Sequence, residues 1–298
     1  MSSRARRLTE EVLYRRRKLC LDGRDTGDAH AESHQWPTNG REPPMSEAAR
    51  VEFLPFRIES WATTHKGCVR DHNEDSYCAR EADGLWAVAD GMGGHEGGEW
   101  ASAQLADKLE KIELPRDFEG ACAAVTEAIS RANRIILAEA RNRRRQMGST
   151  IVVLLVHDTR YAVMWVGDSR GYVLRDGEFI QLSRDHTQVQ EMVERGMMSP
   201  EDAAGHPMGH ILSRAVGVQD EVKVDRVTGE VVPGDVFLLC SDGLHGYVDQ
   251  RDISRALRGS PERAPDELVE LTLANGAPDN VTVIAVWASE PTLLSIPR

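Results

Sequence analysis

Short apolar runs, bounded by Gly, Asn or Asp, recur along most of the chain and predict many short strands. The expected strands cover residues 56–62, 76–79, 85–90, 150–156, 161–166, 172–175, 178–182, 236–240 and 281–286. Asp176-Gly177 separates two of these runs and predicts a type I′ hairpin turn, because this turn needs residues that tolerate positive φ angles.

Longer stretches of the chain follow a helical period instead. Residues 99–112 and 117–141 are expected to form helices, and shorter helices are expected at 252–257 and 265–274. One stripe of the second helix is apolar, with Val125, Ile129, Ala132, Ile136 and Ala140. Many strands and hairpins with two groups of helices favour β-sheets that are covered by helices.

The first 50 residues differ in composition from the rest. They contain the charge run Arg15-Arg16-Arg17-Lys18, followed by a polar stretch rich in Gly and Pro. This composition is typical of a flexible segment. We therefore expect a flexible extension over residues 1–50, one folded domain over 51–290 and a short tail over 291–298. Met45 offers an alternative start for the folded protein, and a basic nucleic-acid-binding arm is the less favoured interpretation of the extension.

Composition and charge exclude several classes of protein. The 298 residues are 41% hydrophobic and 28% charged, as in ordinary soluble domains. No apolar run approaches the ~18 residues of a membrane span, and no secretory signal is visible. The net charge is -12, and residues 1–50 carry 10 Lys+Arg and 8 Asp+Glu, so the remainder carries -14. An acidic body disfavours nonspecific nucleic-acid binding and suits a site that concentrates divalent cations.

The cysteines indicate a reducing, cytoplasmic environment. They are odd in number, at 5, and none forms a C-x-x-C pair. None is followed by Arg at the spacing C-x5-R, which argues against a phosphatase with a cysteine nucleophile.

The stretch from Leu85 to Glu99 joins an apolar strand to a glycine-rich loop through Asp90. A dinucleotide fingerprint fails here, because His95 and Glu96 stand where G-x-G-x-x-G requires Gly, and no G-K-[ST] loop is present. A strand end holds a carboxylate rigidly, while glycines let other groups approach closely. Asp90 is therefore well placed to hold a metal or a phosphate.

Acidic residues recur at other expected strand ends, beside Gly, Ser or Asn. The set is Glu74-Asp75, Asp90-Gly91, Asp168-Ser169, Asp242-Gly243 and Asp279-Asn280. Each pair alone is usually a simple turn. Three of them, Asp90, Asp242 and Asp279, adjoin apolar strands that would direct several carboxylates at one point if they lay side by side. Oxygen ligands suit Mg²⁺ or Mn²⁺, and no set of His and Cys competes.

These acidic residues belong to a longer ordered series of motifs. The series is Gly67-x-x-Arg70-x-x-Asn73-Glu74-Asp75, Val88-Ala-Asp90-Gly91-Met92-Gly93-Gly94-His95, Gly148-Ser149-Thr150, Val166-Gly167-Asp168-Ser169-Arg170, Leu182-Ser-Arg-Asp185-His186-Thr187, Leu239-Cys-Ser241-Asp242-Gly243-Leu244 and Asp279-Asn280-Val-Thr282. Over roughly residues 57–287 the chain resembles the metal-dependent protein serine/threonine phosphatases of the PP2C type. The bacterial branch, in which Asp-Gly-Met-Gly-Gly-His is usual, is the most similar.

The resemblance implies an α+β fold with four layers, α/β/β/α, in which two antiparallel sheets stack face to face and a helix pair covers each outer side. It also implies two Mn²⁺ or Mg²⁺ ions at one end of the sandwich. By the family's pattern Asp90 bridges both ions. Asp242 and Asp279 hold the first ion, and Glu74 and the carbonyl of Gly91 reach the second.

Further roles follow from the same resemblance. Two ions about 3.5–4 Å apart would generate a hydroxide that attacks the phosphorus of phosphoserine or phosphothreonine. Asp75 would orient or deprotonate the water, and Asp168 matches a third, weaker metal site. Arg70 would bind the phosphoryl oxygens through its planar fork. The alternative for Arg70 is a surface salt bridge with Asp71 or Glu74.

The general acid stays unassigned by the sequence. Some family members place a His two residues after the bridging Asp, where this chain has Met92, which cannot donate a proton. For His95 a role in helix entry or packing is favoured, and His186 is expected to be structural. The segment from Thr187 to His210, polar and rich in Met, is expected to be partly helical and to form a flap that selects substrates.

The leading functional hypothesis is a cytoplasmic phosphatase that acts on phosphorylated proteins, with no nucleic-acid or membrane partner. The resemblance alone implies a bacterial serine/threonine kinase as its partner. Two alternatives remain open at this point. One is a catalytically inactive relative that binds a partner, although Asp90, Asp242 and Asp279 are all present. The other is a metallohydrolase for small phosphoesters.

Overall fold

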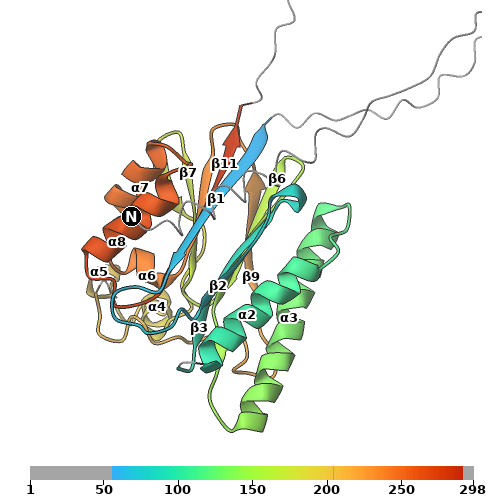
Figure 1. The fold of residues 1–298 in the computed structure, drawn as a ribbon, viewed down its shortest axis with the longest axis vertical. Helices are drawn as coiled ribbons and strands as arrows, with labels where there is room; N and C mark the ends of the chain where they lie inside the picture. Colours follow the sequence, from blue (N-terminus) through green and yellow to red (C-terminus); the bar gives the residue numbers. More distant parts are fainter. Residues whose placement is uncertain (1–55, 95, 204, 291–298) are drawn as a thin grey trace, which may run out of the picture. The chain divides into compact units, whose positions relative to one another are not determined.

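Two stacked β-sheets form the centre of the folded unit, and helices cover their outer faces (Figure 1). The computed structural model describes residues 56–94, 96–203 and 205–290. The expected extension over residues 1–50, the expected tail over 291–298 and His95 lie outside the described residues.

The first sheet has the strand order β1-β11-β10-β7-β8, and all its neighbouring strands are antiparallel. Its strands are β1 (Arg57–His65), β7 (Arg170–Arg175), β8 (Glu178–Gln181), β10 (Val236–Cys240) and β11 (Val281–Ser289). β7 and β8 are joined by the predicted hairpin, in which φ is 51° at Asp176 and 81° at Gly177, as a type I′ turn requires.

The second sheet has the order β2-β3-β5-β6-β9 and is also antiparallel, with the short β4 paired to the end of β3. Its strands are β2 (Asp75–Arg80), β3 (Leu85–Met92), β4 (Gly148–Ser149), β5 (Ile151–His157), β6 (Arg160–Val166) and β9 (Asp225–Glu230). β9 was not predicted, because it is an edge strand in which partly buried residues alternate with exposed polar ones and a Gly.

The helices form the outer layers. α2 (Glu96–Lys111) and α3 (Phe118–Arg143) pack on the second sheet, while α6 (Asp242–His245), α7 (Gln250–Arg258) and α8 (Ala264–Ala274) pack on the first. α4 (Gln188–Glu194) and α5 (Pro200–Ala203) lie in the segment that was expected to be partly helical, and a 3-10 turn, η1, covers Glu81–Asp83. The predicted four-layer α/β/β/α fold is confirmed.

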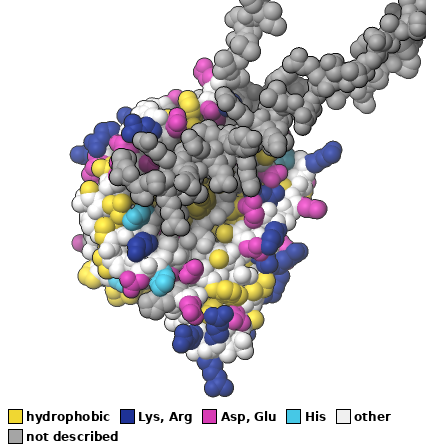
Figure 2. All heavy atoms as spheres, viewed as in Figure 1, with side chains coloured by type: hydrophobic (Ala, Val, Ile, Leu, Met, Phe, Trp, Pro, Cys, Tyr) yellow, Lys and Arg dark blue, Asp and Glu magenta, His cyan; other side chains and the backbone are white. Residues whose placement is uncertain are grey.

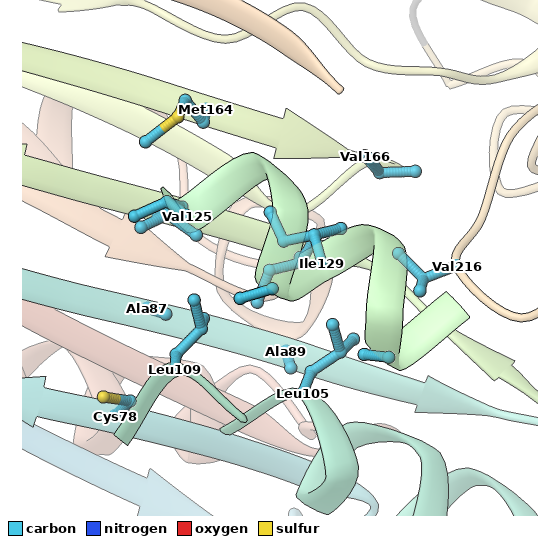
Figure 3. Close-up of a cluster of buried hydrophobic side chains, with 14 of the residues drawn as sticks. Cys78, Ala87, Ala89, Leu105, Leu109, Val125, Ile129, Met164, Val166 and Val216 are labelled. Carbon is cyan, nitrogen blue, oxygen red and sulfur yellow. The ribbon is translucent and has the colours of Figure 1, made fainter. Parts of the chain in front are cut away.

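The position of strand β3 between two buried layers explains why its sequence is continuously apolar. Leu85, Ala87 and Ala89 belong to the layer beneath α2 and α3, whereas Trp86 and Val88 belong to the layer between the sheets. Figure 3 shows the first of these layers, where α2 and α3 present apolar side chains to the sheet. Both faces of the strand are thus buried, so no alternation of apolar and polar residues is required.

The core between the sheets should carry much of the stability. Phe237, in β10, is fully buried there and packs edge-on against Tyr161 of β6, with ring centroids 4.9 Å apart. Because the cavity left by Phe237→Ala could close only by moving both sheets, we expect a loss of about 3–5 kcal/mol in the free energy of unfolding, measured by denaturant titration. Val69→Ala, at a side chain that is 68% exposed, is the control and should change it by less than about 0.5 kcal/mol. A loss of similar size in both variants would contradict this assignment of the core.

Candidate active site

A cavity of about 500 Å³ opens at one end of the sandwich, where β3 ends, β10 leads into α6 and the chain enters β11. Seven of the eight predicted site residues line it: Arg70, Glu74, Asp90, Gly91, Asp168, Asp242 and Asp279. Asp75, the eighth, is buried beside it. Asp90 comes from the second sheet, and Asp242 and Asp279 adjoin neighbouring strands of the first. The three adjoining strands therefore do not all lie side by side in one sheet, and the carboxylates meet across the sandwich instead.

Asp90 is held through its backbone by the turn that enters β5. Its carbonyl oxygen accepts hydrogen bonds from the Thr150 N–H and the Ser149 hydroxyl, both at 2.8 Å, and its N–H donates to the Thr150 hydroxyl at 3.2 Å. Burial, followed by the charges of Asp75 and Asp242, raises the pKa of Asp90 well above its usual range. The carboxylate is thus fixed in a place where negative charge is crowded.

Asp242 and Asp279 complete the acidic wall from the first sheet. Asp242 is the first residue of α6, and burial together with the charge of Asp279 raises its pKa. Asp279 accepts a hydrogen bond from the guanidinium of Arg70 at 2.8 Å. Arg70 therefore forms an ion pair, with Asp279 rather than with Asp71 or Glu74, and it stands at the rim with about half of its side chain exposed.

Asp75 lies opposite Asp90 across the β2–β3 pair. One carboxyl oxygen, Oδ2, accepts from the hydroxyls of Ser241 at 2.8 Å and Thr282 at 2.7 Å. The other, Oδ1, is buried and has no hydrogen-bond partner in the described part of the chain. Burial raises the pKa of Asp75 to about 7, against the opposing effect of the two hydroxyls. Asp75 is thus a carboxyl group with one free oxygen and a pKa near neutrality.

Glycines let the start of α2 approach the site closely. A Cβ at Gly98 would lie 2.0 Å from Oε2 of Glu74, and a Cβ at Gly91 would lie 2.2 Å from the carbonyl oxygen of Gly98. The Glu74 carbonyl accepts from the Gly91 N–H at 3.1 Å and from the Ser102 hydroxyl at 2.6 Å. The backbone of Glu74 is therefore clamped between β3 and α2, and its carboxylate fills a space that only Gly leaves open.

Asp168 sits in the turn between β6 and β7, after Gly167, whose φ of 106° favours Gly. Burial, and next the charge of Asp242, raises the pKa of Asp168 to about 8. Its carbonyl oxygen lies 3.0 Å from Nε2 of His245. Burial lowers the pKa of His245 to about 4, so the ring is neutral at neutral pH. The histidine thus fixes the backbone at Asp168 without compensating the acidic charge.

The donor set fits a hard divalent cation. Five carboxylates line one cavity, and burial with mutual repulsion raises the pKa values of Asp90, Asp168 and Asp242. Oxygen is the ligand that Mn²⁺ and Mg²⁺ accept. Among the described residues no three acidic side chains form a ready-made ligand cage. One ligand candidate, Asp279, is instead engaged with Arg70. Binding of a cation would replace this contact.

Several polar residues that support the site were not singled out from the sequence. Asn280 is the clearest case, because its side chain accepts from the Glu74 N–H at 2.8 Å and donates to the carbonyls of Lys66 and His72 at 3.0 and 2.9 Å. The Thr150 and Ser169 hydroxyls lie 2.6 Å apart beneath the acidic cluster. Their positions inside the ordered motifs were the only signal.

His186 has the contacts of a structural residue, as expected. Its Nδ1 accepts from the Gly167 N–H at 3.0 Å, its Nε2 lies 3.1 Å from Asp225, and its ring stacks on Trp165. Its backbone carbonyl accepts from the Ser213 N–H at 2.9 Å. His186 thus links the turn that carries Asp168 to residues 210–215, which form a wall of the cavity.

The predicted flap contributes to the site through its end rather than through its methionines. His210 and the residues that follow it line the cavity, whereas Met197 and Met198 are absent from its lining. The side chain of Met197 is 71% exposed. The end of the flap and the chain just after it therefore face the cavity.

Comparison with known proteins identifies the family. Residues 57–195 match the model of the protein phosphatase 2C family. The chain is 34% identical over 234 residues to the serine/threonine phosphatase stp of Listeria innocua. This match covers 75% of the chain and 93% of that protein. The chain belongs to the protein phosphatase 2C family. The resemblance drawn from its motifs is confirmed.

Two further similarities are to proteins named PstP. The serine/threonine protein phosphatase PstP of Mycobacterium tuberculosis is 39% identical over 227 residues, or 75% of this chain, and the chain spans only 43% of that protein's length. A crystal structure of the PstP catalytic domain in complex with two manganese ions has a TM-score of 0.69 and 36% identity, covering 78% of this chain and 98% of that domain. No helix within the described residues is long and apolar enough to cross a bilayer.

The crowded carboxyls predict an unusual pH dependence in the metal-free protein. Asp75 and Asp168, with pKa values of about 7 and 8, hold a proton in the folded state that the unfolded chain has already lost above about pH 4. Their contribution to stability is complete below about pH 4 and is lost as the pH rises through these values. In chelator we expect the melting temperature to fall between about pH 6.5 and 8.5.

Two comparisons test the origin of this fall. Added Mn²⁺ should reduce it, because a cation compensates the ionised carboxylates. Asp168→Asn should flatten it, by at most about 1.4 kcal/mol per pH unit. A melting temperature in chelator that stays constant or rises over this range would contradict the assignment.

Proposed function

We propose that this chain is a metal-dependent protein phosphatase that hydrolyses phosphoserine and phosphothreonine in proteins. The observation that carries the proposal is the meeting of five carboxylates and one arginine in a single cavity, in a chain of the protein phosphatase 2C family. Relatives named as serine/threonine phosphatases, and a related catalytic domain solved with two manganese ions, support it.

The proposed metal ligands come from both sheets. Asp90 would be shared by two Mn²⁺ or Mg²⁺ ions, Asp242 and Asp279 would hold the first, and Glu74 with the Gly91 carbonyl would hold the second. Asp168 is the proposed ligand of a third, weaker site. When bound, the metal pair supplies Lewis acidity that lowers the pKa of water.

The other roles belong to side chains of this chain. Arg70 stands at the rim and would bind the phosphoryl oxygens with its planar fork once Asp279 is drawn to a cation. Asp75 would orient the attacking water and accept its proton at Oδ1, the oxygen that the Ser241 and Thr282 hydroxyls leave free. A pKa of about 7 suits a group that takes and returns a proton near neutral pH.

The wider biological setting is also part of the proposal. The substrates would be phosphorylated proteins, with a bacterial serine/threonine kinase as the opposing enzyme, and the catalytic unit would be residues 51–290. A cytoplasmic location agrees with the free cysteines among the described residues, Cys68, Cys78, Cys122 and Cys240. Because Asp90, Asp242 and Asp279 are all present, an inactive binding module is disfavoured. Only substrate preference separates this proposal from a hydrolase of small phosphoesters.

The metal proposal predicts that activity depends strongly on the carboxylate charge of Asp242. Asp242→Asn keeps the shape of the side chain but removes its charge, so we expect a folded protein whose release of phosphate from a phosphothreonine peptide under Mn²⁺ is reduced at least about 100-fold. Asp252→Asn, at the surface of α7, is the matched control and should stay near wild type. Near-normal activity of Asp242→Asn at saturating Mn²⁺ would exclude its role as a ligand.

Arg70 can be tested by separating binding from turnover. If Arg70 holds the phosphoryl group in both ground state and transition state, Arg70→Ala should raise KM for a phosphopeptide more than it lowers kcat. Arg70→Lys should recover only part of the loss, because an ammonium cannot bind two oxygens in one plane. An unchanged KM in Arg70→Ala would show that its ion pair with Asp279 is purely structural.

A further inference from the structure

An arginine run, Arg141-Asn-Arg143-Arg144-Arg145, stands where α3 ends. Figure 2 shows basic side chains gathered at the lower end of the molecule, which is where α3 ends in Figure 1. The helix closes with Arg144 in the left-handed conformation, at φ 52°, and with the Arg145 N–H donating to the Ala140 carbonyl at 3.1 Å. This closure turns Arg144 and Arg145 out of the helix and into the loop that leads to β4.

The loop is fixed against the acidic end of β3. β4 pairs with β3, so that Gly148 lies opposite Met92 and Ser149 opposite Gly91. A Cβ at Gly93 would lie 2.5 Å from the carbonyl oxygen of Gln146, so the two backbones are in direct contact. The two arginines are therefore held at a fixed place relative to Asp90.

Arg145 lies next to the mouth of the active-site cavity. It lines a surface hollow together with Met92, Gly93, Gly94 and Gln146. Those four residues also line the active-site cavity. The hollow and the cavity are thus adjacent, and a peptide with its phosphorylated residue in the cavity would have neighbouring side chains within reach of Arg145.

The charges of Arg144 and Arg145 are not used by the fold. Arg141 pairs with Asp220 at 2.7 Å, and Arg143 pairs with Glu139 at 2.6 Å. Arg144 and Arg145 are exposed, and within residues 56–94, 96–203 and 205–290 their guanidinium groups form no ion pair or hydrogen bond. Both arginines line a second hollow, which shares two lining residues with the cavity. Two cations are therefore available beside a cavity whose wall is acidic.

The conformation of Arg144 also indicates that the fold does not require an arginine side chain at this position. A left-handed residue at the end of a helix is most often Gly, because other residues pay a steric cost there. Backbone geometry alone therefore favours Gly at this position. An arginine that the turn does not require points to a use for its charge.

We propose that Arg144 and Arg145 form a subsite for an anionic side chain of the substrate, close in sequence to the phosphorylated residue. The proposal rests on the proposed phosphatase function and adds a substrate class to it, phosphoproteins with acidic or multiply phosphorylated sites. Carboxylate and phosphate share the chemistry that a guanidinium binds. Such a subsite offsets the repulsion that a body of charge -14 exerts on an acidic substrate.

The test compares phosphothreonine peptides that differ only beside the phosphorylated residue. One has Ala on both sides, a second has Glu, a third has a non-hydrolysable phosphonate analogue of phosphoserine, and a fourth has Lys. The wild type with Mn²⁺ should prefer the Glu or phosphonate peptide to the Ala peptide by about five- to tenfold in kcat/KM at low salt, and less at high salt. Comparing the Glu and phosphonate peptides tells which anion is preferred.

Variants then locate the preference. The double variant Arg144→Gly, Arg145→Ala should bring the anionic-to-Ala ratio close to one without lowering the melting temperature, since Gly suits the turn. Arg145→Glu should shift the preference towards the Lys peptide. Arg134→Ala, on the same helix and paired with Glu127, is the control and should keep the wild-type ratio.

The outcomes separate the two proposals. A wild type without preference, or a double variant that loses activity equally on all four peptides, would overturn the subsite. Failure of the wild type to release phosphate from any peptide under Mn²⁺ would overturn the proposed function instead. In that case the subsite is still tested by measuring the affinity for a labelled Glu-flanked phosphopeptide by fluorescence anisotropy. The subsite proposal requires the double variant to bind this peptide more weakly than the wild type does.

Discussion

Repulsion among buried carboxylates is the constraint on which the site depends. Five acidic side chains line a cavity of about 500 Å³, and Asp75 lies buried beside it. Hydrogen bonds fix this cluster without neutralising it: hydroxyls bind one oxygen of Asp75, and the turn at Thr150 binds the backbone of Asp90. Arg70, paired with Asp279, supplies nearby positive charge. Burial, and after it repulsion from Asp242, raises the pKa values of Asp75 and Asp168 to about 7 and 8.

Only a stiff fold can hold such a cluster together. Asp90 reaches the cavity from one sheet, and Asp242 and Asp279 reach it from the other. Their separation is therefore set by how the sheets pack, through fully buried residues such as Trp86 and Phe237. On the outer side, Gly91 and Gly98 let α2 close onto the strand end. The core and the glycines thus determine the geometry of the charges.

The sequence predicted what local patterns determine and missed what depends on tertiary contacts. Continuous apolar runs such as the one before Asp90 gave the central strands, and the family motifs gave the cavity-lining residues. β9 was missed because an edge strand needs few apolar residues. The polar scaffold around Asn280 was missed because its three backbone contacts join distant parts of the chain. Likewise, nothing local shows that Asp90 faces Asp242 across two sheets.

The same electrostatics indicate where substrate preference should be located. The phosphorylated substrate that we propose would bring negative charge to a cavity that is itself acidic, so its approach would depend on cations outside the cluster. Arg70 stands at the rim, where the phosphoryl group would enter, and it is already paired with Asp279. Arg144 and Arg145 lie farther out, unpaired among the described residues and held by the pairing of β4 with β3. Chemistry and preference can therefore reside in separate parts of the site, since changes in this loop alter charge at the rim and leave the carboxylates in place.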